Sequence, residues 1–334
     1  MPARPRLKPH LRPLRRGPTT LQLGLEPRQG LVLDGVTESE AAWVTSLDGT
    51  RTLAGSVAEA AAHGIPPDRA RRLLDLLRAH GALVEAPAGR WHFASLAQHA
   101  PRSLALDADA LAASDPAPGD GFSVLAARAR QEAVVAGTGP LAVEICALLR
   151  RAGARATLIG PYAGGPAGVP AAQEVDPAPD LAVVVGTLPL PPDAAAAWHS
   201  GGVAHVPVAV GTSTALVGPV VHPGRTACVR CLDLARTDLD PVWPVLLAQA
   251  LPTAVGPVPE VDAETSLLAL TASITAMAAL AALDGRDGAT GVSLEVSLPW
   301  PEITQRRWLP HPDCACGAAT WELGGSADLA TRAS

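Results

Sequence analysis

The sequence nearly lacks lysine, since Lys8 is the only one among 334 residues. No Gly-x-x-x-x-Gly-Lys sequence is present, which excludes P-loop phosphate chemistry because that loop needs its lysine. A continuous apolar stretch of the secretory type is also missing at the start, where Pro and Arg interrupt every candidate run. We therefore expect a cytoplasmic protein.

The chain also lacks an overall positive charge. The formal net charge is -6, although the first 16 residues carry six positive charges and no acid. A broad nucleic-acid footprint is therefore not expected. The one long apolar helix candidate, 266–284, holds Thr271, Ser273 and Thr275 and follows Asp262 and Glu264 closely. We interpret it as a buried core helix, so no membrane partner is expected.

The length predicts two domains, of which the first, 1–97, is a small winged helix that mixes helices and strands. Three short strand-like runs, at 10–15, 20–25 and 31–35, precede three helices. The helices are expected to begin at caps on Thr37 and Thr52 and at the Pro66-Pro67 entry, and a strand follows Gly81.

A segment rich in Ala, Asp, Pro and Gly, 98–128, is expected to be a linker with a short connecting helix. The second domain, 129–334, alternates apolar strands with helices, which predicts an α/β fold with a parallel, Rossmann-like sheet. Its expected strands lie at 132–136, 156–159, 181–185 and 206–210.

Four of the five cysteines form two close pairs. They are Cys228, Cys231, Cys314 and Cys316. Two such turns can close a tetrahedral Zn²⁺ site, which would be structural because four thiolates leave no open coordination position. His222 and His311 precede the pairs, so a histidine could replace one cysteine or hydrogen-bond to the ligands. The alternatives are reduced buried cysteines or disulfides.

The turn Gly137-Thr138-Gly139, between a strand and a helix, is a candidate remnant of a nucleotide site. Ala142 replaces the third glycine of the dinucleotide fingerprint, and Gly160 stands where an acid would bind ribose. The alternative is a turn that serves packing alone.

Together, the Gly-Thr-Gly turn, the Cys228-x-x-Cys231 knuckle and the His311-Pro-Asp-Cys314-x-Cys316 knuckle resemble the E1-like (ThiF) superfamily. The chain resembles more closely the ThiF-like proteins of thiazole/oxazole-modified peptide biosynthesis, which are cyclodehydratase partners or leader-peptide-binding proteins. In those families a peptide-recognition winged helix related to the PqqD fold precedes a ThiF-like domain with a four-cysteine zinc site. The resemblance covers about 9–86 and 129–318.

The resemblance also implies which chemistry is missing. Adenylating members use a lysine and arginines on the triphosphate and one Asp after each of the second and fourth strands. Here Gly160 and Gly186-Thr187 stand at the two positions where those acids would be. Neutralising the phosphate charge would therefore depend on arginines such as Arg150 and Arg151. We therefore expect no catalytic residue and no ATP requirement.

The predicted function is a zinc-stabilised, non-catalytic scaffold that binds a ribosomal precursor peptide and presents it to a YcaO-type or other modifying enzyme. The peptide is expected to add to the strand of Leu31, Leu33 and Val36, beside the third helix. The helix residues expected to face the peptide are Arg71, Arg72, Asp75 and Arg78. The alternatives are an E1-like adenylyltransferase and a winged-helix DNA-binding regulator, and a homodimer is left open.

Overall fold

The computed structural model describes residues 4–25, 30–85, 103–114, 121–160, 178–251 and 263–318. Contacts divide the chain into two compact units, Met1–Ala129 and Arg130–Ser334. The parts of the expected first domain at 86–97, and of the expected linker at 98–102 and 115–120, lie outside the described residues.

The three strands predicted near the start form an antiparallel sheet in the first unit. They are β2 (Pro13–Gly17), β3 (Thr20–Leu23) and β4 (Leu31–Asp34), in the order β2-β3-β4, so that β2 and β4 are its edges. A shorter strand, β1 (Pro5–Leu7), was not predicted. It pairs antiparallel with β5 (Leu83–Glu85), the strand expected after Gly81.

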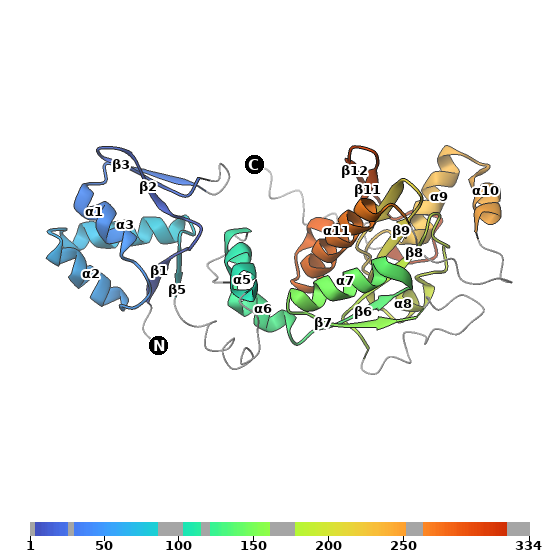
Figure 1. Ribbon diagram of the computed structural model, residues 1–334, viewed down its shortest axis with the longest axis horizontal. Coiled ribbons are helices and arrows are strands. Elements are labelled where there is room, and N and C mark those ends of the chain that lie inside the picture. The colour runs from blue at the N-terminus through green and yellow to red at the C-terminus, as the bar shows by residue number, and fades with distance from the viewer. Residues whose placement is uncertain are drawn as a thin grey trace. The chain divides into compact units, whose positions relative to one another are not determined.

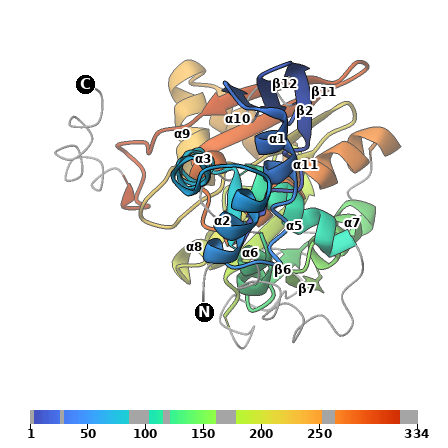
Figure 2. The same ribbon diagram turned by 90° about the vertical axis from the view of Figure 1, so that its left-hand side faces the viewer.

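Three helices follow the sheet, as predicted, and lie together in Figure 2. They are α1 (Glu38–Thr45), α2 (Leu53–Ala62) and α3 (Pro67–Ala79). The Thr37 hydroxyl accepts a hydrogen bond from the Glu40 amide, and the Glu40 carboxylate accepts one from the Thr37 amide, which completes the expected capping box. Their apolar faces share one core with the sheet.

Arg69, near the start of α3, is half-buried and points toward the sheet and α1. Its Nε donates to Glu40 Oε1 at 2.7 Å, and its guanidinium also donates to the carbonyl of Gly35 at 2.8 Å. Glu40 is buried, and a buried carboxylate needs such a charged partner. Arg69 thus ties α3 to the end of β4 and to the start of α1.

Two further helices complete the first unit, α5 (Ser103–Ser114) and α6 (Phe122–Arg128). They pack against each other, and Gly121 at their crossing has a φ of +74° and no room for a Cβ against the backbone of α5. The single lysine is structural: Lys8 is buried, and its Nζ donates to the carbonyl of Ala112 at 2.7 Å. It therefore neutralises the negative end of the α5 dipole.

The second unit is built on one seven-stranded sheet in the order β12-β11-β10-β9-β8-β6-β7. Its parallel strands are β6 (Glu132–Ala136), β7 (Arg155–Ile159), β8 (Leu181–Thr187) and β9 (Ala204–Val210). Its antiparallel strands are β10 (Thr214–Val217), β11 (Val292–Ser297) and β12 (Glu302–Arg307). The Rossmann-like α/β prediction is confirmed.

The four predicted strands are parallel, as expected, whereas β10, β11 and β12 were not predicted and run antiparallel. The tight turn after β9, closed by the Gly211 amide on the Thr214 carbonyl at 2.8 Å, reverses the chain. Such a short connection joins antiparallel strands, because a parallel pair needs a long crossover.

Helices cover both faces of this sheet. On one face α7 (Gly139–Arg151) and α11 (Thr265–Leu283) pack side by side (Figure 1), and on the other α8 (Ala196–Ser200) buries Trp198. By length and composition α11 could cross a membrane. It packs on the sheet instead and buries Leu267 and Leu283 in the core, as the interpretation of 266–284 as a core helix predicts.

The Glu40–Arg69 pair generates a stability prediction. Burial alone would raise the pKa of Glu40, but hydrogen bonds from Arg69 and Thr37 outweigh it and lower the pKa. A lowered carboxyl pKa contributes stability above the unfolded pKa, and this contribution is lost as pH falls. Glu40→Gln should therefore destabilise the first unit by about 1–3 kcal/mol at pH 7, and by less as the pH falls below about 4.5.

Thermal unfolding of the full chain between pH 3 and 7 measures this effect. Glu38→Gln is the matched control, because Glu38 lies in the same helix turn but is 93% exposed and 3.8 Å from Arg15. Equal effects of the two substitutions would contradict the assignment.

Candidate metal centre and the neighbouring pocket

The four cysteines predicted as ligands come together at one end of helix α9 (Val229–Leu239). Cys228 is the N-cap of the helix and Cys231 lies in its first turn, whereas Cys314 and Cys316 follow β12. Their sulfur atoms all lie within 4.8 Å of one another. Two pairs of thiols from distant parts of the chain therefore face one point.

The spacing of the sulfurs fits a tetrahedral metal ion. Cys228 Sγ lies 3.7 Å from the sulfurs of both Cys231 and Cys314, and Cys231 Sγ lies 3.6 Å from that of Cys316. Four thiolates at about 2.3 Å from a metal would be about 3.8 Å apart. A disulfide needs about 2.05 Å, so the disulfide alternative is wrong for these four residues, which are free.

The pKa values of the thiols in the cluster are shifted in different directions. The hydrogen bond from the Cys228 thiol lowers the pKa of Cys231, and the same pairing raises that of Cys228. Burial raises the pKa of Cys314. Since metals bind thiolates, loading the site releases protons, and the affinity for metal should fall as pH falls.

Neither candidate histidine belongs to the cluster. His311 Nδ1 accepts a hydrogen bond from the Asp313 amide at 3.1 Å, so its Nε2 carries the proton and donates to Asp238 Oδ2 at 2.9 Å. The His311 carbonyl also accepts from the Cys314 amide. His311 therefore orients the second cysteine pair and fastens it to α9. The backbone amide of His222 donates to the hydroxyl of Thr226 within the same turn.

The Gly-Thr-Gly turn joins β6 to α7, where a nucleotide remnant was predicted. Gly137 has a φ of +156°, and a Cβ there would lie 2.8 Å from that of Val185 on β8. Packing therefore accounts for this glycine. At the helix start, Pro140 lacks the N–H group that could have bound a phosphate.

The two arginines considered as phosphate ligands lie at the C-terminal end of α7, far from the Gly-Thr-Gly turn. The helix has 13 residues, so Arg150 and Arg151 lie about 17 Å from its start at about 1.5 Å per residue. Arg150 donates to the carbonyl of Ala156, and Arg151 pairs with Glu144 at 2.8 Å. Gly160 and Gly186 do stand at the ends of β7 and β8, as predicted.

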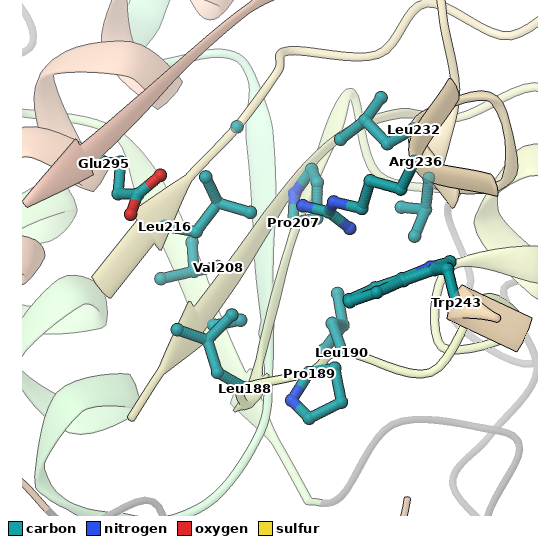
Figure 3. Close-up of a pocket in the computed structure, with 13 residues that line it drawn as sticks. Leu188, Pro189, Leu190, Pro207, Val208, Leu216, Leu232, Arg236, Trp243 and Glu295 are labelled. Atoms are coloured by element: carbon teal, nitrogen blue, oxygen red, sulfur yellow. The ribbon is translucent and has the colours of Figure 1, made fainter. Parts of the chain in front are cut away.

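A pocket that the sequence did not reveal opens where β8 ends (Figure 3). It has a volume of about 180 Å³ and a largely apolar lining from the segment after β8, from β9, from β10 and from α9. Arg236 and Glu295 reach it from opposite sides, as the figure shows. Arg236 also pairs with Asp233 at 3.1 Å and lies over the Trp243 ring.

The metal centre and this pocket share helix α9. The helix begins at Cys228, and its next two turns supply Val229, Leu232 and Arg236 to the pocket wall. An elongated apolar segment with a polar group at each end would suit this lining. No sequence signal marks the pocket, because its residues come from six separate segments.

In the first unit, the predicted peptide residues fall into two groups. The side chains of Leu33 and Val36 are buried, so at Leu33 the edge of β4 away from β3 offers a partner only backbone, whereas Val32 is exposed. Along α3 the exposed charges mostly pair within the helix. Arg71 pairs with Asp68 at 2.9 Å, and Arg78 pairs with Asp75 at 3.2 Å. Arg72 is exposed as well.

No family model matches the sequence, and no curated protein sequence matches it. The fold is similar to that of the heterocyclase TruD, with a TM-score of 0.65, 19% identity, and coverage of 95% of this chain and 43% of TruD. A heterocyclase in complex with substrate and cofactor has a TM-score of 0.64 and 19% identity, and the match covers 96% of this chain and 40% of the heterocyclase. E. coli MccB solved with AMPCPP and MccA has a TM-score of 0.63 and 10% identity, and the match covers 93% of this chain and 99% of MccB.

These similarities confirm the Rossmann-like fold. The chain spans less than half the length of the two heterocyclases, whereas it matches MccB over nearly the whole of both chains.

The cysteine geometry predicts one metal ion per chain. Cys231→Ser should abolish metal binding, because serine oxygen is a poor replacement for a buried thiolate, and it should loosen α9. Cys146→Ser is the matched control, since Cys146 is an equally buried cysteine on α7 outside the cluster. Elemental analysis of both purified variants is the measurement. Unchanged metal content in Cys231→Ser would show that the cluster is not the site.

Proposed function

We propose that the chain is a zinc-stabilised scaffold that binds a ribosomal precursor peptide through its first unit and presents it to a separate modifying enzyme. Four facing sulfurs favour zinc, because soft thiolates in a tetrahedral arrangement are its usual structural site. The ion would fasten the segment after β12 to α9, with no open position for catalysis.

The peptide role rests on the outer edge of β4, with which no strand among the described residues pairs. An extended peptide can add there through main-chain hydrogen bonds, as in other β-augmentation complexes. Leu31 is half-buried and the side chain of Val32 is exposed beside this edge, so a peptide side chain would meet apolar surface. The edge is the single observation that carries the proposal, and the winged-helix resemblance supports it.

A modifying enzyme as partner is suggested by the resemblance to cyclodehydratase partner proteins. We infer that this partner is of YcaO type.

The second candidate is an ATP-dependent adenylyltransferase. It is favoured by the similarity to MccB. A structure of MccB with ATP matches this chain with 10% identity and a TM-score of 0.61. Against it stand Gly160, Gly186 and the two arginines directed away from the turn. Phosphate binding would have neither a lysine nor a metal-binding acid there.

ATP-pyrophosphate exchange separates the two candidates. With precursor peptide present the chain should stay at background, because no group at the turn can neutralise the triphosphate, while MccB with MccA serves as the positive control. Peptide-dependent exchange above background would sink the scaffold proposal.

A charge variant tests the peptide site. Arg72→Glu should weaken binding of an acidic precursor peptide by up to about fivefold, the range of one exposed ion pair. Arg71→Glu is the control, because Asp68 already neutralises Arg71. Fluorescence anisotropy gives the affinities, with a precursor peptide encoded beside this chain as the probe.

Hydrogen exchange tests the strand itself. Bound peptide should slow exchange of the β4 amides and leave those of β2, the opposite edge, unchanged. Equal protection at both edges, or at neither, would refute strand addition at β4.

A further inference from the structure

The outer edge of the large sheet is unusually open. All six residues of β12 are exposed, and among the described residues no strand pairs with its outer side. Large apolar side chains mark the same edge: Trp300 is 85% exposed, Ile303 is 50% exposed and Leu309 is 67% exposed. An open edge with exposed apolar residues can template pairing with another strand.

Charged residues often protect such an edge by repelling a second strand. Those of β12 have the opposite effect toward a copy of the same strand. Two antiparallel copies related by a two-fold axis normal to the sheet must pair about one central residue, because only then do opposed side chains share a face.

With Thr304 at the centre, Glu302 of one copy lies opposite Arg306 of the other, and this pair occurs twice. Thr304 faces itself, and Ile303 faces Gln305. Opposite charges and paired threonines are both favourable cross-strand neighbours. Centring the pair on Gln305 would instead place Ile303 opposite Arg307 and leave Glu302 without an opposed cation.

The same register also accounts for the exposed residues beyond the strand. Trp300 precedes β12 by two residues and Leu309 follows it by two. In the antiparallel pair the start of one strand meets the end of the other, so Trp300 of each copy approaches the 308–309 segment of its mate. Two apolar contacts would then flank the central ladder.

We propose that two copies of this chain associate through β12, antiparallel and centred on Thr304, into one continuous fourteen-stranded sheet. The occupant of the edge is a second copy, because the sequence of the strand is complementary to itself. This association is independent of the peptide role proposed for the first unit.

Sedimentation equilibrium of the full chain, loaded with zinc, tests the association. The chain should sediment as a dimer. Glu302→Arg and Arg306→Glu should each weaken the dimer by about tenfold, since each creates two like-charge pairs. The double exchange Glu302→Arg with Arg306→Glu should restore it.

Arg307→Glu is the control, because it changes the net charge as Arg306→Glu does but lies opposite Pro301. A monomer at all concentrations, no rescue by the double exchange, or an equal effect of Arg307→Glu would overturn the proposal.

Cross-linking tests the register. Thr304→Cys should form an intermolecular disulfide on mild oxidation, because residues opposed across a ladder lie within disulfide range. Gln305→Cys should not, since the two copies of that residue are offset along the strands. Cross-linking at position 305 but not at 304 would refute the register, and none at either position would refute the edge contact.

Discussion

The second unit depends on the convergence of two cysteine pairs at the start of α9. The segment after β12 buries Trp308 in the same apolar cluster, and the sulfurs, together with His311 on Asp238, fasten this segment to the helix. Because α9 also forms a wall of the pocket, a metal ion would set the position of Leu232 and Arg236 as well. The candidate metal site and the pocket wall are thus held by the same helix.

The first unit uses charge in a comparable way. The basic start of the chain suggests a nucleic-acid contact when it is considered alone, but its lysine is buried on the last turn of α5. On α3 Arg71 and Arg78 have acidic partners, and Arg69 is occupied by Glu40. The surface that remains available is a strand edge with apolar side chains beside it, which suits a peptide better than a phosphate backbone.

Packing explains the glycine that opens the Gly-Thr-Gly turn. Gly137 is required by the close approach of β8, since a Cβ there would lie 2.8 Å from that of Val185. Phosphate binding additionally needs donors and cations, and Pro140 and the distant Arg150 supply neither. The turn therefore carries fold information and supports the scaffold proposal over adenylation.

Local patterns in the sequence determined the helix caps at Thr37 and Thr52, the strands of the parallel sheet and the candidate metal ligands. These depend on neighbours within a few residues, or on the strong preference of paired cysteines for one ion. The partner of β1, the reversal into β10, the role of Arg69 and the pocket beside α9 depend on contacts between distant segments. Only the tertiary structure decided those, because a side chain's partner across space leaves no periodic signal in its own segment.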